Sequence, residues 1–427
     1  MLPRIQFVLF ILLISCPALF AQKGKKADKL LLDNLETHIH YLSDPKLEGR
    51  KAGAPGEKVA SDYISIEFMK AGLQSKGDNN GWLQAFEIDE GKQIDPDAWF
   101  SVNDKAFILH KEYFPLAFSP AVTVSGAPAI ALQERGDPWF IDLKDMVEAG
   151  HNTPHFDLNE AIHTRVKESA KKGATAIILY NTSKIADNLA FDPKDRTEKS
   201  PIPVLYITKE AKRKYLKDES ASLEMKIKVA FTERKRTGHN VLGWIDNGAP
   251  VTVIIGAHYN GADDHTGGVA GTIELAKMLK QSRFKNNNYL FIAFSGEEPG
   301  LFGSVHFVDH PAIDLKKVNY MINLDPAGNP NDSSSHTLTI GGYGSSPAWS
   351  EACGGSVNKK YFTLSYDSSG TGTGDQTAFY RKDIPVLLFS TGLNKDDYTG
   401  EAELLRAVYN LVGAVNGKGR IAFTKIR

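Results

Sequence analysis

The stretch that decides the fold is Val251–Gly268, VTVIIGAHYNGADDHTGG. It opens with an apolar run, which is typical of a strand buried on both faces of a sheet. His258 follows this run directly, and a polar, glycine-rich turn then carries two adjacent aspartates, the second of which is Asp264. From Gly267 onward the apolar residues recur with the period of an amphipathic helix. The stretch therefore predicts a strand, a turn with imidazole and carboxylate groups, and a helix that packs back on the strand.

The same arrangement recurs further along the chain. The apolar run 289–294 leads into Ser-Gly-Glu-Glu at 295–298, and the run 318–324 leads into Asp325. Helical periodicity is expected at 267–280, 301–310 and 403–415. Near-continuous apolar strands that alternate with helices predict an α/β fold, in which a mostly parallel mixed sheet is covered by helices on both faces.

The polar groups at these strand ends predict a metal site. In open α/β sheets, ligands bind at the carboxyl ends of the strands. Taken singly, each group has an ordinary explanation, because Asp264 could be a helix N-cap and adjacent glutamates are usually solvated. Together, one imidazole and several carboxylates are the ligand types of a hydrolytic zinc centre. The candidates are His258, Asp264, Glu297, Glu298 and Asp325.

These segments resemble the co-catalytic zinc aminopeptidases, a family that includes bacterial leucyl aminopeptidase and aminopeptidase Y and is related to glutaminyl cyclase. The resemblance is carried by HYNGADDHTGG at 258–268, GEEPGLFGS at 296–304 and NLD at 323–325. LEGR at 47–50 is similar to the family's N-terminal Leu-x-Gly-Arg stretch, so the likeness spans nearly the whole mature chain.

The resemblance implies zinc as the cofactor and assigns roles to the candidates. Asp264 would bridge two zinc ions, His258 and Asp325 would complete the ligand set of one ion, and Glu298 would bind the other. Glu297 would be the catalytic residue, the general base that takes a proton from the activated water.

Three positions depart from the family pattern. Asn260 stands where the family has an aspartate that orients the first histidine; an amide can still accept from the imidazole but adds no negative charge. Tyr398 stands in the place of the late histidine ligand, and Gly374-Asp375-Gln376 replaces Ser-Asp-His. We therefore expect one tight zinc site and a doubtful second site, with at best an oxygen donor from the loop at 396–398.

The beginning of the chain predicts export. A basic residue at Arg4, a short apolar core and Ala21 before Gln22 indicate a signal peptide over residues 1–21, and hence a secreted or periplasmic protein. The apolar run is too short to span a membrane. A less favoured alternative is a lipoprotein, with Cys16 as the lipidated residue.

Changes along the chain in the pattern of expected strands, helices and polar loops predict the domain boundaries. Residues 22–113 should be the N-terminal part of a peptidase domain, and 233–427 the part that carries the metal site. Between them, 114–232 should be an inserted, smaller, β-rich domain that resembles a protease-associated domain.

Composition and motifs together lead to a functional interpretation. With 427 residues, a net charge of -1 and 24% charged residues, nothing indicates nucleic acid or an anionic membrane as a partner. We interpret the chain as a secreted zinc-dependent aminopeptidase that acts on peptides and whose second metal site is impaired. Two alternatives stay open: a degenerate member that binds peptide or metal without turnover, and a one-metal enzyme that cyclises N-terminal glutamine.

Overall fold

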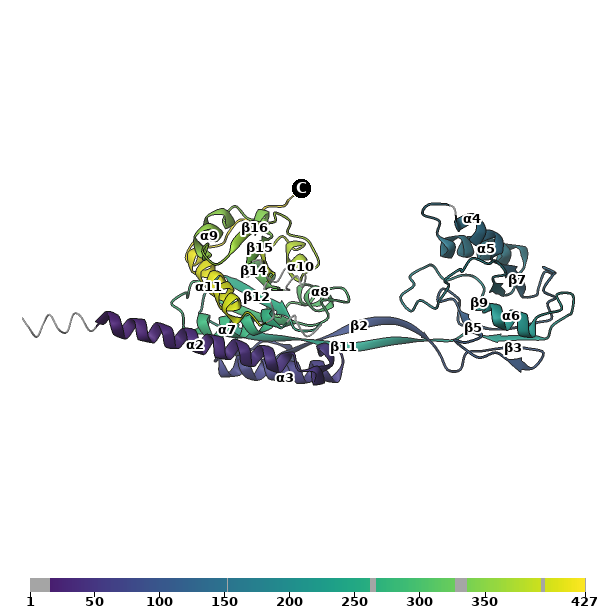
Figure 1. The fold of residues 1–427 in the computed structure, drawn as a ribbon, viewed down its shortest axis with the longest axis horizontal. Helices are drawn as coiled ribbons and strands as arrows, with labels where there is room; N and C mark the ends of the chain where they lie inside the picture. Colours follow the sequence, from purple (N-terminus) through teal and green to yellow (C-terminus); the bar gives the residue numbers. More distant parts are fainter. Residues whose placement is uncertain (1–15, 152, 262–265, 327–335, 393–395, 427) are drawn as a thin grey trace, which may run out of the picture. The chain divides into compact units, whose positions relative to one another are not determined.

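The computed structural model describes residues 16–151, 153–261, 266–326, 336–392 and 396–426, with side chains from residue 26 onward. The chain divides into two compact units (Figure 1). The first unit combines the chain up to Ile88 with Arg236–Arg427, and the second is Asp89–Lys235. The candidate site residues all belong to the first unit.

The first unit is built on one mixed sheet in the order β1-β11-β13-β12-β14-β17-β15-β16, with β2 also paired to β11. The strands are β1 (Gln74–Ser75), β2 (Leu83–Ile94), β11 (Phe231–Ile245), β12 (Thr252–His258), β13 (Asn288–Phe294), β14 (Val318–Leu324), β15 (Thr337–Gly341), β16 (Thr363–Tyr366) and β17 (Val386–Thr391). Strands β13, β12, β14 and β17 run parallel to one another, whereas β11 and β15 pair antiparallel with this central group. The predicted α/β fold with a mostly parallel mixed sheet is confirmed.

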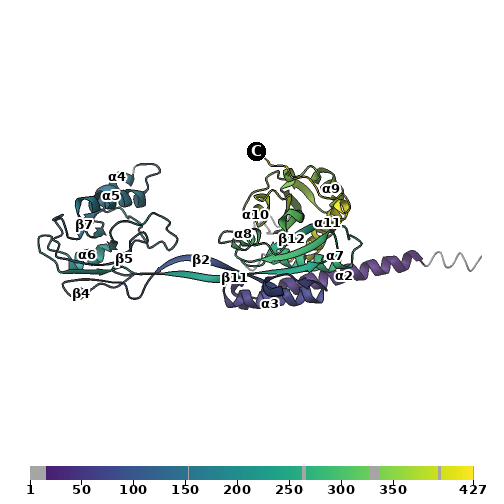
Figure 2. The ribbon, with the colours of Figure 1, turned by 180° about the vertical axis from the view of Figure 1, so that it is seen from behind.

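Helices cover both faces of this sheet (Figures 1 and 2). One face carries α2 (Cys16–Leu42), α3 (Pro55–Lys70), α7 (Gly267–Gln281), α9 (Trp349–Ser356) and α11 (Tyr398–Val415); the other carries α8 (Phe302–Asp309) and α10 (Gln376–Tyr380). Neighbouring residues of β13 pack on opposite faces of the sheet: Phe291 belongs to the hydrophobic core on one face, and Ile292 belongs to the core on the other. This two-sided burial explains why the strands are apolar throughout.

A buried polar network attaches α2 to the unit. His38 of α2 contacts the Tyr63 hydroxyl through Nδ1 at 2.7 Å and Glu274 Oε1 of α7 through Nε2 at 3.0 Å. Lys277 Nζ donates to the same carboxylate at 2.7 Å. Because each charged group has an opposite partner, α2 can bury polar side chains against α3 and α7. None of the helices in the described ranges combines the length and apolar character that a membrane crossing requires.

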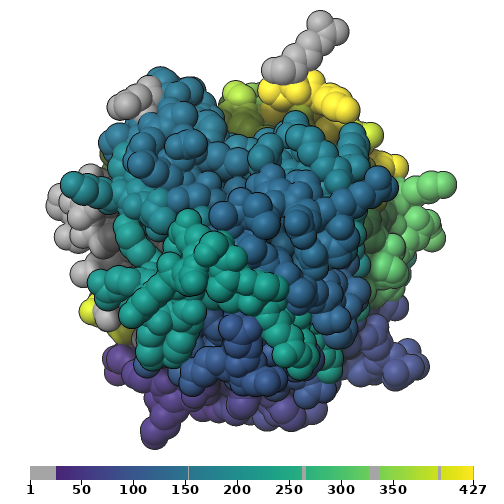
Figure 3. Space-filling model, turned by 90° about the vertical axis from the view of Figure 1, so that its right-hand side faces the viewer, coloured from purple at the N-terminus to yellow at the C-terminus, as the bar shows by residue number. Residues whose placement is uncertain are grey.

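The second unit contains two small sheets. One is antiparallel, in the order β4-β3-β10-β6, and the other has the order β5-β9-β8-β7, with β7, β8 and β9 parallel. Its elements are β3 (Trp99–Val102), β4 (Lys105–Ala106), β5 (Tyr113–Pro115), β6 (Thr123–Gly126), β7 (Trp139–Asp142), α4 (Lys144–His151), α5 (Leu158–Lys172), β8 (Ile177–Tyr180), β9 (Val204–Ile207), α6 (Lys209–Tyr215) and β10 (Met225–Lys228). Figure 3 shows the surface of this unit in blue and teal.

The second unit begins earlier than the insertion that the sequence predicts, at Asp89 rather than at residue 114. The reason is a long-range strand pairing. Strand β3 pairs with β10, in the register Phe100 to Ile227, and so joins the unit despite preceding residue 114. Strands β2 and β11 each contain residues of both units. The resemblance of this unit to a protease-associated domain stays a prediction.

Candidate metal centre

Three adjacent parallel strands deliver the candidate side chains to one edge of the sheet. Strand β12 lies between β13 and β14, and its last residue is His258. Glu297 and Glu298 follow the end of β13, and Asp325 follows the end of β14. Because parallel strands share the direction of their carboxyl ends, these segments meet beside His258.

The imidazole of His258 is held at both nitrogens. Its side chain is buried, and Nδ1 donates to the backbone carbonyl of Asn260 at 2.8 Å. A carbonyl oxygen only accepts, so the proton is on Nδ1 and Nε2 is the nitrogen available to a ligand. Nε2 lies 3.5 Å from Oδ1 of Asp325. A backbone carbonyl thus performs the orienting role that the sequence assigned to the side chain at position 260.

The side chain of Asn260 has a different partner. Its Oδ1 accepts a hydrogen bond from the backbone N–H of Glu297 at 3.1 Å, and Asn260 itself is buried. One residue therefore contacts His258 through its carbonyl and the Glu297 segment through its amide. This link between the ends of β12 and β13 was not expected from the sequence.

Glu298 and His258 both lie close to Gly261. A Cβ atom added to Gly261 would lie 2.6 Å from Glu298 Oε1 and 3.7 Å from His258 Cε1. The φ angle of Gly261 is +123°, which disfavours any side chain there. Glu297 is half-buried, and Glu298 is exposed. Burial raises the pKa of Glu297; the charge of His258 opposes this, and the charges of Asp325 and Glu298 add to it.

The site carries an excess of negative charge. Burial alone would lower the pKa of His258, but Asp325, Asp375 and Glu297 outweigh it and raise the pKa to about 9. The carboxylates therefore favour a cation at this position. In the metal-free state the imidazole proton supplies that positive charge, and a bound metal ion would replace it.

Asp375 is a buried carboxyl beside this group that the sequence did not assign to the site. Neither of its oxygens has a hydrogen-bond partner in the described part of the chain. The Ser304 hydroxyl is near enough to lower the pKa of Asp375. Its own hydrogen bond, however, is donated to the Leu301 carbonyl at 3.3 Å. Burial raises the pKa of Asp375 to about 7. The one feature of the sequence that marked Asp375 was its position in Gly374-Asp375-Gln376, which replaces the Ser-Asp-His of the family pattern.

Three further residues considered from the sequence are Asp264, Tyr398 and Asp397. Asp264 lies outside the described residues. The Tyr398 hydroxyl is 3.4 Å from His40 Nε2 of α2, and Asp397 caps α11 by accepting from the Gly400 N–H at 2.9 Å. Tyr361 also donates to Asp397 at 3.0 Å. The side chains of Tyr398 and Asp397 thus have structural partners elsewhere in the unit.

The donor set fits zinc. His258 and Asp325 supply an imidazole nitrogen and a carboxylate oxygen, donor types that zinc takes in proteins, and Nε2 and Oδ1 lie 3.5 Å apart as an ion pair. Among the described residues no group of three or more His, Cys, Asp or Glu side chains is arranged to hold a metal. The third ligand of the predicted set, Asp264, lies outside those residues.

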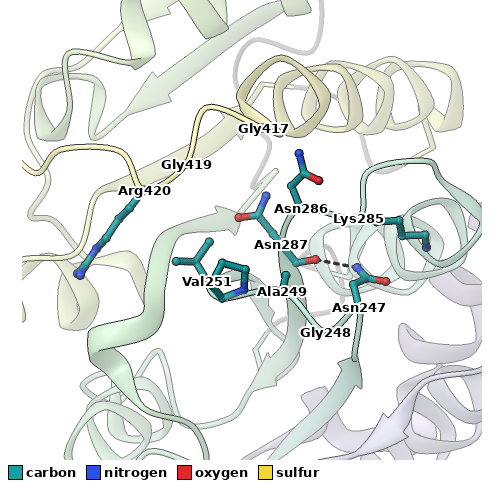
Figure 4. Close-up of a pocket in the computed structure, with 11 residues that line it drawn as sticks. Asn247, Gly248, Ala249, Val251, Lys285, Asn286, Asn287, Gly417, Gly419 and Arg420 are labelled. Atoms are coloured by element: carbon teal, nitrogen blue, oxygen red, sulfur yellow. Dashed lines mark hydrogen bonds between the residues drawn. The ribbon is translucent and has the colours of Figure 1, made fainter.

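A pocket of about 410 Å³ lies at the opposite edge of the sheet, before the starts of β12 and β13 (Figure 4). Asn247, Asn287 and Arg420 are among the residues that line it. Asn247 Nδ2 donates to the Asn287 carbonyl at 2.7 Å, so these polar groups partly satisfy one another. The pocket contains none of the metal-site candidates.

Comparison with known proteins identifies what this chain is similar to. Residues 240–407 match Peptidase family M28. Aminopeptidase YwaD of Bacillus subtilis is 30% identical over 253 residues, covering 56% of this chain and 52% of the relative. A probable leucine aminopeptidase 2 of Aspergillus oryzae is 29% identical, covering 52% and 48%. The chain thus spans about half the length of these curated relatives.

Among solved structures, a zinc aminopeptidase from Bacillus subtilis, BSAP, aligns over 88% of this chain and 94% of its own, with 21% identity and a TM-score of 0.48. The sequence match covers the ends of β12, β13 and β14, where the candidate side chains lie. The part of the chain that is similar to Peptidase family M28 is thus residues 240–407.

Proposed function

We propose that the chain is a metallo-aminopeptidase that uses zinc to hydrolyse the N-terminal bond of peptides. One observation carries the proposal: His258, Glu297 and Asp325 lie at the carboxyl ends of three adjacent parallel strands inside the region that is similar to Peptidase family M28. The relatives named above are aminopeptidases, which supports cleavage at the N-terminal end of the substrate.

In this proposal His258 and Asp325, together with Asp264, hold the tighter zinc ion, and Glu298 belongs to a weaker second site. Zinc, when bound, polarises the scissile carbonyl and makes water acidic enough to lose a proton near neutral pH. The hydrogen bond from Nδ1 to the Asn260 carbonyl supports the ligand role of His258, because it fixes the ring and leaves Nε2 for the metal.

Glu297 is the proposed general base. Its half-buried carboxylate follows the strand next to His258, and its raised pKa suits a group that must accept and then release a proton. It would take the proton of the attacking water and deliver it to the leaving amine. The hydrogen bond from the Glu297 N–H to Asn260 holds the start of this segment in place.

A second candidate function is binding without turnover. The observation that favours it is Tyr398, which stands in the place of the family's late histidine ligand and whose hydroxyl lies 3.4 Å from His40 Nε2. Measured hydrolysis separates the two functions. We also propose, from the leader-like residues 1–21, that the protein is exported.

The experiment combines metal analysis with turnover. The purified full-length chain is loaded with zinc, its metal content per chain is measured, and the release of aniline from aminoacyl-anilides is followed. Stoichiometric zinc with turnover that is lost in Glu297→Gln supports the enzyme. Zinc binding without turnover supports the binding protein, and absence of bound zinc contradicts the enzyme.

A further inference from the structure

A short segment near the N-terminus lies against the loop that leaves β12. It is residues 47–50, Leu-Glu-Gly-Arg, at the end of the 3-10 helix η1 (Pro45–Arg50). Three successive residues, Glu48, Gly49 and Arg50, have positive φ angles of 48°, 64° and 54°. Non-glycine residues rarely adopt this region, and such strain persists only where surrounding contacts hold it. The contacts made by Arg50 explain why the chain keeps this conformation.

Arg50 is fully buried and donates to backbone carbonyls. Its Nε donates to Tyr259 O at 2.6 Å, and its Nη2 donates to Gly261 O at 3.1 Å. A third bond runs from Nη1 to Leu42 O, at the end of α2. The planar guanidinium presents its donors in a fixed fork, so it can bind separated carbonyls at the same time.

The backbone of Gly49 completes the contact. The Gly261 N–H donates to Gly49 O at 3.0 Å. The peptide group between Asn260 and Gly261 is therefore held through its N–H by Gly49 and through its carbonyl by His258 Nδ1. Arg50 holds the carbonyls of the peptide groups before and after it. Three consecutive peptide groups beside His258 are thus fixed by residues 49–50.

Asn260 carries the effect to both sides of the site. Its carbonyl orients the His258 imidazole, and its side chain accepts from the Glu297 N–H. We propose that Arg50 is a positioning residue of the metal centre, which acts by fixing the peptide groups around Asn260 and hence the direction of His258 Nε2. The inference rests on the proposed function for the metal centre itself.

Glu274 offers a matched control, because it is also a buried charged residue that joins separate elements. It is 4% exposed and contacts His38 at 3.0 Å, Lys277 at 2.7 Å and Asn34 at 3.2 Å. None of these partners belongs to the loop after β12. A change at Glu274 should lower stability without disturbing the peptide groups around Asn260.

The test compares full-length Arg50→Lys and Glu274→Gln with the unaltered chain. Lysine keeps the positive charge, but its single ammonium cannot replace a fork that reaches both Tyr259 and Gly261. The metal-free proteins are titrated with zinc in competition with a chromophoric chelator, and their melting temperatures are recorded. Amide hydrogen exchange of peptides that contain residues 259–261 is measured on the same metal-free samples.

We expect Arg50→Lys to weaken zinc binding by about 10- to 100-fold, the usual cost of losing support behind a metal ligand, and to speed exchange at Gly261. Glu274→Gln should lower the melting temperature and leave zinc affinity and Gly261 exchange unchanged. Zinc affinity in Arg50→Lys within about threefold of the unaltered chain would overturn the inference. So would an equal loss of affinity in both variants.

A second variant applies if Arg50→Lys does not fold. A Cβ at Gly49 would lie 3.1 Å from Gly261 O, so Gly49→Ala presses on the same peptide groups while keeping the buried charge. It should also weaken zinc binding and speed exchange at Gly261, and unchanged values for both would overturn the inference. If the unaltered chain binds no zinc, the proposed function fails. The exchange measurement then still tests whether Arg50 fixes the peptide groups around Asn260.

Discussion

His258 donates its Nδ1 proton to the backbone carbonyl of Asn260, two residues further along the chain, at 2.8 Å. The side chain of Asn260 meanwhile accepts from the Glu297 N–H at 3.1 Å. One residue therefore orients the proposed metal ligand with its backbone and supports the proposed base with its side chain. Because the two contacts use different groups of the same residue, mutation can separate them.

Asn260→Ala should separate metal binding from turnover. The alanine backbone still accepts from His258, so we expect zinc affinity to stay within about threefold of the unaltered chain. The lost hydrogen bond to Glu297 should lower the turnover number with little change in KM, because the base is less well positioned. Chelator competition and anilide kinetics measure the two effects. A large loss of zinc affinity would show that the side chain, not the carbonyl, orients His258.

Glu297→Gln should remove hydrolysis and leave zinc content unchanged. Glutamine keeps the shape of the side chain but cannot take a proton, and loss of a general base typically costs about 100- to 10,000-fold in rate. Glu351→Gln is the control, since Glu351 is exposed and pairs with Lys418 at 2.7 Å. Substantial activity in Glu297→Gln would assign the base to another group.

The second zinc ion should bind more weakly than the first. Tyr398 replaces the late histidine of the family pattern, and its hydroxyl lies 3.4 Å from His40 Nε2. The second site therefore keeps carboxylates without a histidine, and such a donor set favours harder ions than zinc. Calorimetric titration of the metal-free chain should resolve two unequal steps, and Tyr398→Phe should not alter them. Two equally tight steps would mean that another residue replaces the histidine. A change in Tyr398→Phe would show that the phenol oxygen is itself a donor.

Glu401→Gln should stabilise the protein at alkaline pH. Glu401 is buried in the first turn of α11, and its Oε2 has no hydrogen-bond partner among the described residues. Burial, with a contribution from the charge of Asp397, raises its pKa from 4.5 to about 8. The folded state thus holds a proton that the unfolded state releases. The stability due to this proton is complete below the unfolded pKa and is lost as the pH rises through the folded value.

Glutamine resembles the protonated form and does not titrate. Between about pH 5 and 8, the free energy of unfolding of the variant relative to the unaltered chain should rise by at most about 1.4 kcal/mol per pH unit. Melting temperatures of the variant and the unaltered chain from pH 5 to 9 measure this trend. The diagnostic quantity is the change with pH of the stability difference between the two proteins, not its value at any one pH. A difference that does not change with pH would show that Glu401 is ionised in the folded protein.

The sequence alone predicted the sheet and the side chains at its edge. Strands β12, β13 and β14 are apolar throughout because both faces are buried, and this pattern is visible without a structure. Parallel strands share the direction of their carboxyl ends, so His258, Glu297, Glu298 and Asp325 could be grouped from order alone. The roles assigned to them, and to Asp264, stay predictions.

Only the tertiary structure decided how that edge is supported. The binding of Arg50 to Tyr259 and Gly261 joins residues 209 and 211 positions apart, and the pairing of β3 with β10 includes residues before 114 in the second unit. The carbonyl of Asn260 orients His258, and a backbone group leaves no trace in side-chain identity. The first two cases share a physical reason: local periodicity records which faces are buried, whereas partners distant in sequence are selected by packing and by the need to satisfy buried polar groups.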